Sequence, residues 1–114
     1  MGAGREQVLL RVFIGEADRH GHRPLYETLV ELFRKEGLSG ATVLRGVFGF
    51  GGHSEFHSAK LLSISADLPM VVEVVDTREK IDAVLPRVEE LMDGGLVTLE
   101  QVAAIRPVRR RGEG

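Results

Sequence analysis

The chain has 114 residues, a hydrophobic content of 43% and a formal net charge of −2. This length and apolar content suit one compact domain. The absence of cysteine excludes disulfides, thiolate metal sites and thiol nucleophiles. No apolar run approaches the ~18 residues of a membrane span, and residues 1–11 lack the apolar core of a signal peptide, so we expect a soluble, cytoplasmic protein.

Charge is unevenly distributed along the chain. Residues 106–114 hold four arginines and one glutamate, a net charge of +3, so the first 105 residues carry −5. The near-neutral total gives no general case for nucleic-acid binding. We expect one domain over residues 1–114, with flexible ends at 1–7 and 107–114.

The first third of the chain predicts a strand followed by a helix. Residues 8–14 are β-branched, aromatic and almost all apolar, which predicts a central strand buried on both faces and ended by Gly15. Between Pro24 and Glu36 the apolar residues recur at helical spacing, and Gly37 suits the helix C-terminus. The predicted buried stripe of this helix is Leu25, Leu29, Leu32 and Phe33.

The middle of the chain predicts two strands separated by a long loop. Residues 41–48 read as a strand, and the three glycines within residues 49–52 then interrupt regular structure. Residues 60–65 suit a short returning strand. Residues 70–75 predict a strong strand because they are rich in valine.

The last third predicts a helix and a weaker strand. Asp76, with Glu79 three residues later, is a variant capping box that opens the helix, and Gly94–Gly95 ends it. Residues 101–105 form the weaker final strand. The predicted apolar stripe of the helix is Ile81, Val84, Leu85, Val88, Leu91 and Met92.

The predicted order is βαββαβ, which gives an α+β ferredoxin-like sandwich with an antiparallel sheet and both helices on one face. The opposite sheet face then needs a cover, because alternate residues such as Val43, Val71 and Glu73 do not make it fully polar. Self-association is the economical cover.

Several linked motifs carry a family resemblance. Gly37–Val43, Gly49–Gly51, Gly52–Glu55 and Leu68–Pro69 resemble the G-[IL]-[ST]-G-x-T-V, G-F-G, G-H-[ST]-E and L-P series of nitrogen-regulatory PII signalling proteins. The chain resembles more closely the PII-like group of domain of unknown function family 190. That likeness runs through Leu9–Glu16, His22–Glu27, Gly40–Gly46, Gly49–Ser54, Asp67–Val71, Val75–Ile81 and Gly95–Glu100. It implies a PII-like trimer, ligand sites in clefts between subunits, and no established enzymatic activity.

The sequence departs from PII proteins proper at three places. Residues 94–101 lack the lysine and most of the glycines of the PII phosphate loop. The modifiable tyrosine of some PII loops aligns near His57. Residues 51–53 have no counterpart of the glutamine and lysine beside the PII 2-oxoglutarate site. The resemblance therefore carries over the scaffold without these ligand residues.

The candidate ligand site combines the glycine-rich loop with flanking cations. Glycines here permit a nest of backbone N–H groups for an anion, although a flexible hairpin tip and ordinary surface charge explain the same residues. Glu16, Asp18 and Arg19 are further candidates for lining the cleft. The predicted ligand-binding residues are Arg45, Gly49, Phe50, Gly51, Gly52, His53, Ser54, Lys60 and Arg106.

Metal binding and catalysis have weaker signals. His53 and His57, four residues apart, are the metal candidates, with His20 and His22 as a second pair, but no carboxylate cluster completes either set. Ser54 beside these histidines lacks an evident orienting acid. We expect no cofactor and no enzymatic activity.

The leading hypothesis is a regulatory sensor. A homotrimer binds a small anionic ligand, with an adenine nucleotide as one candidate, and its long loop acts on a partner protein. By analogy with PII systems, the partner is a membrane transporter or channel. The alternatives are a metal- or ion-responsive trimeric stress protein and an uncharacterised hydrolase.

Overall fold

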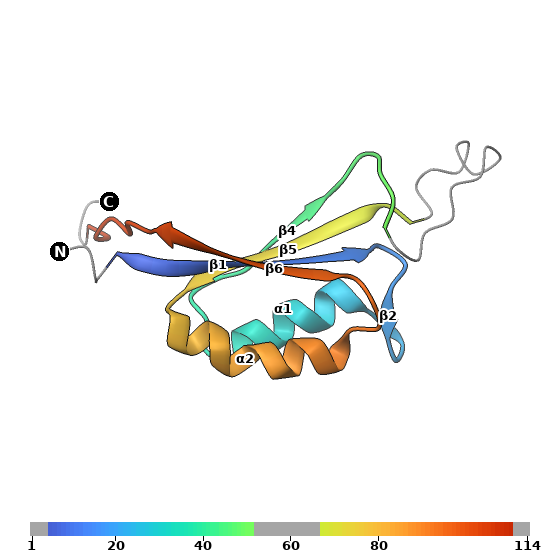
Figure 1. The fold of residues 1–114 in the computed structure, drawn as a ribbon, viewed down its shortest axis with the longest axis horizontal. Coiled ribbons are helices and arrows are strands. Elements are labelled where there is room, and N and C mark those ends of the chain that lie inside the picture. The colour runs from blue at the N-terminus through green and yellow to red at the C-terminus, as the bar shows by residue number, and fades with distance from the viewer. Residues whose placement is uncertain (1–4, 52–66, 111–114) are drawn as a thin grey trace.

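The computed structural model describes residues 5–51 and 67–110. Four strands form an antiparallel sheet in the order β4-β5-β1-β6, and both helices cover one face of it (Figure 1). This is the ferredoxin-like α+β arrangement that the sequence predicts. The elements of the sandwich are β1 (Glu6–Gly15), α1 (Leu25–Lys35), β4 (Thr42–Arg45), β5 (Pro69–Asp76), α2 (Arg78–Leu91) and β6 (Leu96–Ala103).

A short hairpin that the sequence did not predict precedes α1. Strands β2 (Arg19–His20) and β3 (Arg23–Pro24) pair around Gly21, whose φ of 66° suits a tight turn. His20 and His22 are both exposed there.

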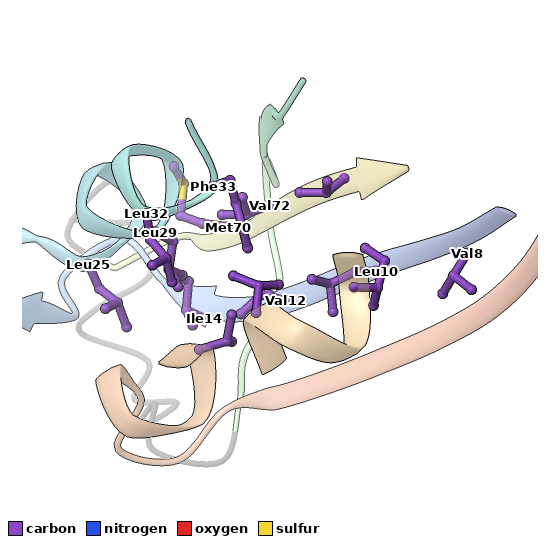
Figure 2. Packing of buried hydrophobic residues seen from close by; sticks show 14 residues of the cluster. Val8, Leu10, Val12, Ile14, Leu25, Leu29, Leu32, Phe33, Met70 and Val72 are labelled. Carbon is purple, nitrogen blue, oxygen red and sulfur yellow. The ribbon is translucent and has the colours of Figure 1, made fainter. Parts of the chain in front are cut away.

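The hydrophobic core lies between the sheet and the two helices (Figure 2). Along β1 every second residue is buried, so one side of the strand supplies Val8, Leu10, Val12 and Ile14. The prediction that this strand is buried on both faces is wrong for the single chain, because only one face of the sheet has helices. The residues of the other face are half-buried.

Helix α1 has the predicted apolar face. All four residues of its predicted stripe are buried. Gly37 follows the helix with a φ of 81°, and its N–H donates to the Arg34 carbonyl at 3.1 Å. A glycine at this position ends the helix without a side-chain penalty.

The N-cap of helix α2 lies one residue later than predicted. Thr77 is its N-cap, and its hydroxyl accepts the Lys80 N–H at 3.2 Å. Asp76 is the last residue of β5, and its carboxylate has other partners, described below. Ile81, Val84 and Val88 are fully buried, and the rest of the stripe packs partly against the core.

Strand boundaries differ from the predictions at both ends of the chain. β6 begins at Leu96, five residues earlier than predicted, because Leu96–Ala103 pairs with β1 along the whole strand. β1 begins at Glu6, so Gln7 belongs to the sheet and not to a flexible end. β4 ends at Arg45, three residues early. The strand predicted at 60–65 lies outside the described residues.

The sheet face away from the helices is largely apolar. A row of charge crosses it, where Arg11 pairs with Glu73 at 2.8 Å and with Glu100 at 3.4 Å. Val43 was predicted on this face but pairs with Val72 and packs against the core. We call this surface the open face; by the strand register its apolar residues include Leu9, Phe13, Leu44, Val71, Val75 and Leu96.

Candidate functional site

A cavity of about 530 Å³ lies at one end of the sheet, where β1 ends and β5 and β6 begin. This volume is in the range of small-molecule sites. Its wall is mostly apolar. The residues that line it are Phe13, Ile14, Gly15, Asp18, Phe50, Gly51, Asp67, Pro69, Met70, Gly94, Gly95 and Leu96.

Two glycines allow neighbouring segments of the cavity wall to pack closely against the end of β1. A Cβ on Gly95 would lie 2.7 Å from the Phe13 carbonyl oxygen, and the φ of Gly95 is 87°. A Cβ on Gly15 would lie 2.6 Å from Oδ1 of Asp67. Glycine at these positions lets the turn before β6 and the Asp67 carboxylate approach the end of β1.

Two carboxylates on the cavity wall are fixed by backbone donors. Asp18 Oδ2 accepts the Gly15 N–H at 2.9 Å, and Asp67 Oδ1 accepts the Ala17 N–H at 3.0 Å. The first donor is the last residue of β1, and the second lies in the turn that follows β1. The backbone therefore sets the position of each acid.

An ion pair lies at the same end of the sheet. The Arg45 guanidinium donates to Oε2 of Glu16. The Glu16 side chain is 19% exposed, and its second oxygen, Oε1, is buried with no hydrogen-bond partner among the described residues. The charge of Arg45 is thus matched by a neighbouring carboxylate.

A second polar cluster lies at the opposite end of the sheet and centres on Arg106. Its guanidinium donates to Gln7 Oε1 at 2.7 Å, and to Ser39 Oγ and the Val75 carbonyl at 3.0 Å each. All three acceptors are neutral. Arg106 is therefore held in place by three segments of the chain and keeps its positive charge.

The buried Asp76 carboxylate binds the backbone of Ser39, which is one of the residues that contact Arg106. It is 5% exposed, and its carboxylate accepts the Ser39 N–H at 2.8 Å and the Thr77 N–H at 2.7 Å. Burial acts to raise the pKa of Asp76, but the two backbone donors and the Lys80 charge outweigh it, so the pKa is lowered. The ionised carboxyl thereby fixes the segment that presents Ser39 to Arg106.

The structure separates the predicted ligand residues into two groups. Phe50 and Gly51 line the cavity, and Arg45 lies at the same end of the sheet. Met70, the register partner of Arg45, and Val75, the acceptor of Arg106, are five residues apart on β5, or about 17 Å at ~3.4 Å per residue. Gly49 does not line the cavity; Gly52, His53, Ser54 and Lys60 lie outside the described residues and stay predictions.

The sequence indicated Asp18 as a candidate for lining the cleft, whereas Asp67 was noted only as part of the family motif Asp67–Val71. The signal for Asp67 was its place directly before the Leu68–Pro69 entry into β5. Arg19, also a cleft candidate, donates to the His22 carbonyl at 3.1 Å and does not line the cavity.

Within residues 5–51 and 67–110, no three histidine, cysteine or acidic side chains come together in a way that would hold a metal ion. The metal candidates His53 and His57 lie outside those ranges. No helix of the described part of the chain is long and apolar enough to span a membrane.

Residues 7–104 match the model of domain of unknown function family 190, described as uncharacterized ACR, COG1993. The chain belongs to this family. A UPF0166 protein of Aquifex aeolicus (strain VF5) is 39% identical over 97 residues, which cover 85% of this chain and 91% of that protein. A UPF0166 protein of Methanocaldococcus jannaschii is 33% identical over 94 residues, covering 80% and 84%.

Solved structures show the same fold in PII-like proteins. CPII, a nitrogen regulatory PII-like protein from Thiomonas intermedia K12 bound to ADP, AMP and bicarbonate, matches with a TM-score of 0.56 and 17% identity over 90% of this chain and 97% of CPII. A second CPII structure, with ADP, AMP and acetate, has a TM-score of 0.57 and 17% identity over 90% of this chain and 92% of that one. This member of family 190 therefore has a PII-like fold.

Proposed function

We propose that this chain is a cytoplasmic PII-like regulatory protein, not an enzyme, and that it binds an adenine nucleotide in clefts between the subunits of a homotrimer. The observation that carries the proposal is the position of Arg106. Its guanidinium is oriented by neutral oxygens and keeps a full charge for an anion, as a phosphate-binding arginine requires.

The cavity and Arg106 cannot serve one small ligand within a single chain. They lie at opposite ends of the sheet, and Arg45, the cation nearer the cavity, is already paired with Glu16. In a ring with rotational symmetry, two different surfaces of each protomer meet, and we propose that these are the two ends of the sheet. Such a contact brings the cavity of one subunit to the Arg106 of the next and completes a site with both apolar and cationic walls.

The open face supports association into a trimer. It exposes apolar side chains on all four strands, including Leu44, which is 49% exposed, and Leu96, which is 56% exposed. Apolar side chains on both sides of its row of charge are costly to leave in water unless another surface covers them. Three copies of this face packed around one axis would cover it.

The comparison with CPII supports the ligand class. CPII has this fold and is described with ADP and AMP bound. An apolar cavity beside polar groups suits a nucleoside, and a separate fixed arginine suits its phosphate. We propose that binding changes the loop that begins at Gly49, and that this loop acts on a partner protein, a membrane transporter or channel.

Isothermal titration calorimetry with AMP and ADP tests the proposal, together with a solution mass. We expect a trimer, saturable binding, and a rise in the midpoint of thermal unfolding, since ligand at 100 times its Kd adds about 2.7 kcal/mol of stability. Arg106→Gln should weaken binding at least tenfold. Arg34→Gln, which removes an equal charge from the exposed surface of α1, is the matched control.

Three results would contradict the proposal. A folded monomer would remove the clefts between subunits. Equal binding by the Arg106→Gln variant and the control would remove the role of Arg106. A thermal response to Zn²⁺ or Cu²⁺ without any response to nucleotides would favour the metal-responsive alternative.

A further inference from the structure

The cavity carries an unbalanced negative charge. Among the described residues that line it, the charged side chains are those of Asp18 and Asp67. Backbone N–H groups of Gly15, which ends β1, and of Ala17 in the turn after it hold one oxygen of each carboxylate, so neither acid turns away from a ligand without losing a hydrogen bond. A ligand in this cavity therefore meets two fixed carboxylates.

Arg45, at the same end of the sheet, does not offset these acids. It is paired with Glu16, whose other oxygen is buried without a hydrogen-bond partner among the described residues. The described lining of the cavity therefore holds two acids and no base. In the proposed intersubunit site, one Arg106 from the neighbouring subunit faces the two carboxylates of the cavity.

We infer that Asp18 and Asp67 select the ligand by its phosphate number, so that the site prefers a nucleoside monophosphate to the di- and triphosphates in the absence of divalent cations. This inference rests on the proposed function and adds to it the class of nucleotide. The apolar wall and the carboxylates suit the nucleoside, because carboxylates accept hydrogen bonds from ribose hydroxyls. One arginine is enough for one phosphate. Each further phosphate adds negative charge near two carboxylates, and the described lining of the cavity holds no cation to offset it.

The expected size of the effect follows from charges several ångströms apart. At the effective dielectric of a partly exposed site, each added phosphate charge should weaken binding by roughly tenfold. The repulsion is electrostatic and should therefore decrease as salt rises. These two properties distinguish charge selection from a merely steric limit on ligand size.

Titration calorimetry with AMP, ADP and ATP at low salt with EDTA tests the inference. For the wild-type chain we expect affinity to fall in the order AMP, ADP, ATP. The variant Asp18→Asn/Asp67→Asn keeps the side-chain volume and an oxygen acceptor for each backbone N–H. It should narrow the ratio of the ATP Kd to the AMP Kd by tenfold or more. Glu89→Gln, which removes a charge from exposed α2, should leave the ratio unchanged.

A measurement on the wild-type chain keeps the inference testable if the double variant fails to fold. Raising NaCl from 20 to about 300 mM should narrow the same ratio several-fold. ATP binding as tight as AMP binding in EDTA, or a ratio that neither salt nor the double variant changes, would overturn the inference and leave the proposed function intact. Failure of the wild-type trimer to bind any of the three nucleotides would instead overturn the proposed function.

Discussion

Asp76→Asn should destabilise the folded chain and loosen the segment that holds Ser39. Asp76 is almost fully buried and accepts hydrogen bonds from the Ser39 and Thr77 N–H groups. Asparagine has nearly the same volume, but its single oxygen can satisfy only one of these donors fully. Its amide group then turns toward the other N–H and leaves that donor unsatisfied.

The size of this loss can be estimated from the two hydrogen bonds. A hydrogen bond to a charged group contributes about 1.5–3 kcal/mol, and a buried unsatisfied donor costs about 1–3 kcal/mol. The first hydrogen bond survives in the variant as a bond to the neutral amide oxygen, so the net loss in unfolding free energy should be roughly 2–3 kcal/mol. For a domain of this size that corresponds to a fall in Tm of about 8–12 °C.

The difference between wild type and variant should also depend on pH. The pKa of Asp76 in the folded chain lies below its ordinary value of 3.8. A depressed carboxyl pKa stabilises the folded state at every pH above the unfolded value, and this contribution disappears as pH falls through the folded pKa. The stability gap should therefore be complete at pH 7 and shrink below about pH 4.

Urea denaturation from pH 7 down to pH 3 measures this gap, and amide hydrogen exchange at Ser39 reports the local loosening. Asp82→Asn, an exposed position on α2, is the matched control and should change stability by less than about 0.5 kcal/mol. Equal stability of the Asp76→Asn variant and wild type at pH 7, or a gap that persists unchanged to pH 3, would refute the role assigned to the carboxylate.

Two further substitutions test the open face and the cavity wall. Val71→Lys places a charge among the apolar residues of the open face, beside Phe13 and Leu44, and should convert the proposed trimer to a folded monomer in analytical ultracentrifugation. Ala83→Lys on exposed α2 should not. A trimeric Val71→Lys protein would mean that another surface joins the subunits. Gly95→Ala should lower the unfolding free energy by at least about 2 kcal/mol more than Gly37→Ala in urea denaturation, because both have positive φ but only Gly95 meets atoms within 4 Å. Equal losses would show that the wall relaxes around a methyl group.

The sequence predicted the elements whose pattern is strongly periodic. The buried stripe of α1 follows from spacing alone, since such a pattern leaves few alternatives for burial. Strands β1 and β5 follow from their β-branched, apolar composition, whereas the single buried face of β1 does not. Element order then led to the antiparallel sheet with helices on one face.

Boundaries that depend on partners were predicted less well. The start of β6 is rich in residues that favour strands, namely Leu96, Val97, Thr98 and Leu99, but it aligns with the phosphate loop of PII proteins. Its pairing with β1 was therefore not predicted. Asp76, the acidic residue before α2, was predicted to cap the helix. Its carboxylate instead accepts the Ser39 N–H, and Thr77 caps the helix. The residues around Asp76 do not indicate that its carboxylate accepts a hydrogen bond from Ser39, which lies 37 residues earlier in the chain.

The candidate site was the least predictable part. Asp18 and Asp67 line the same cavity only because the chain returns to the end of β1 some 50 residues later. Arg45 and Arg106 were grouped by their charge, although the strand register places them at opposite ends of the sheet. Charge and composition identify such groups, but only the register shows which of them lie together.

The placement of β1 in the sheet has a consequence for how the chain folds. β1 precedes the other strands of its sheet in the chain, but both of its neighbours come late: Phe13 pairs with Val71 of β5 and with Leu96 of β6. Long-range pairings of this kind slow folding, because a large loop must close before any contact is gained. On the ribosome, the apolar strand β1 must wait for almost all of the sandwich to emerge before the sheet can close around it.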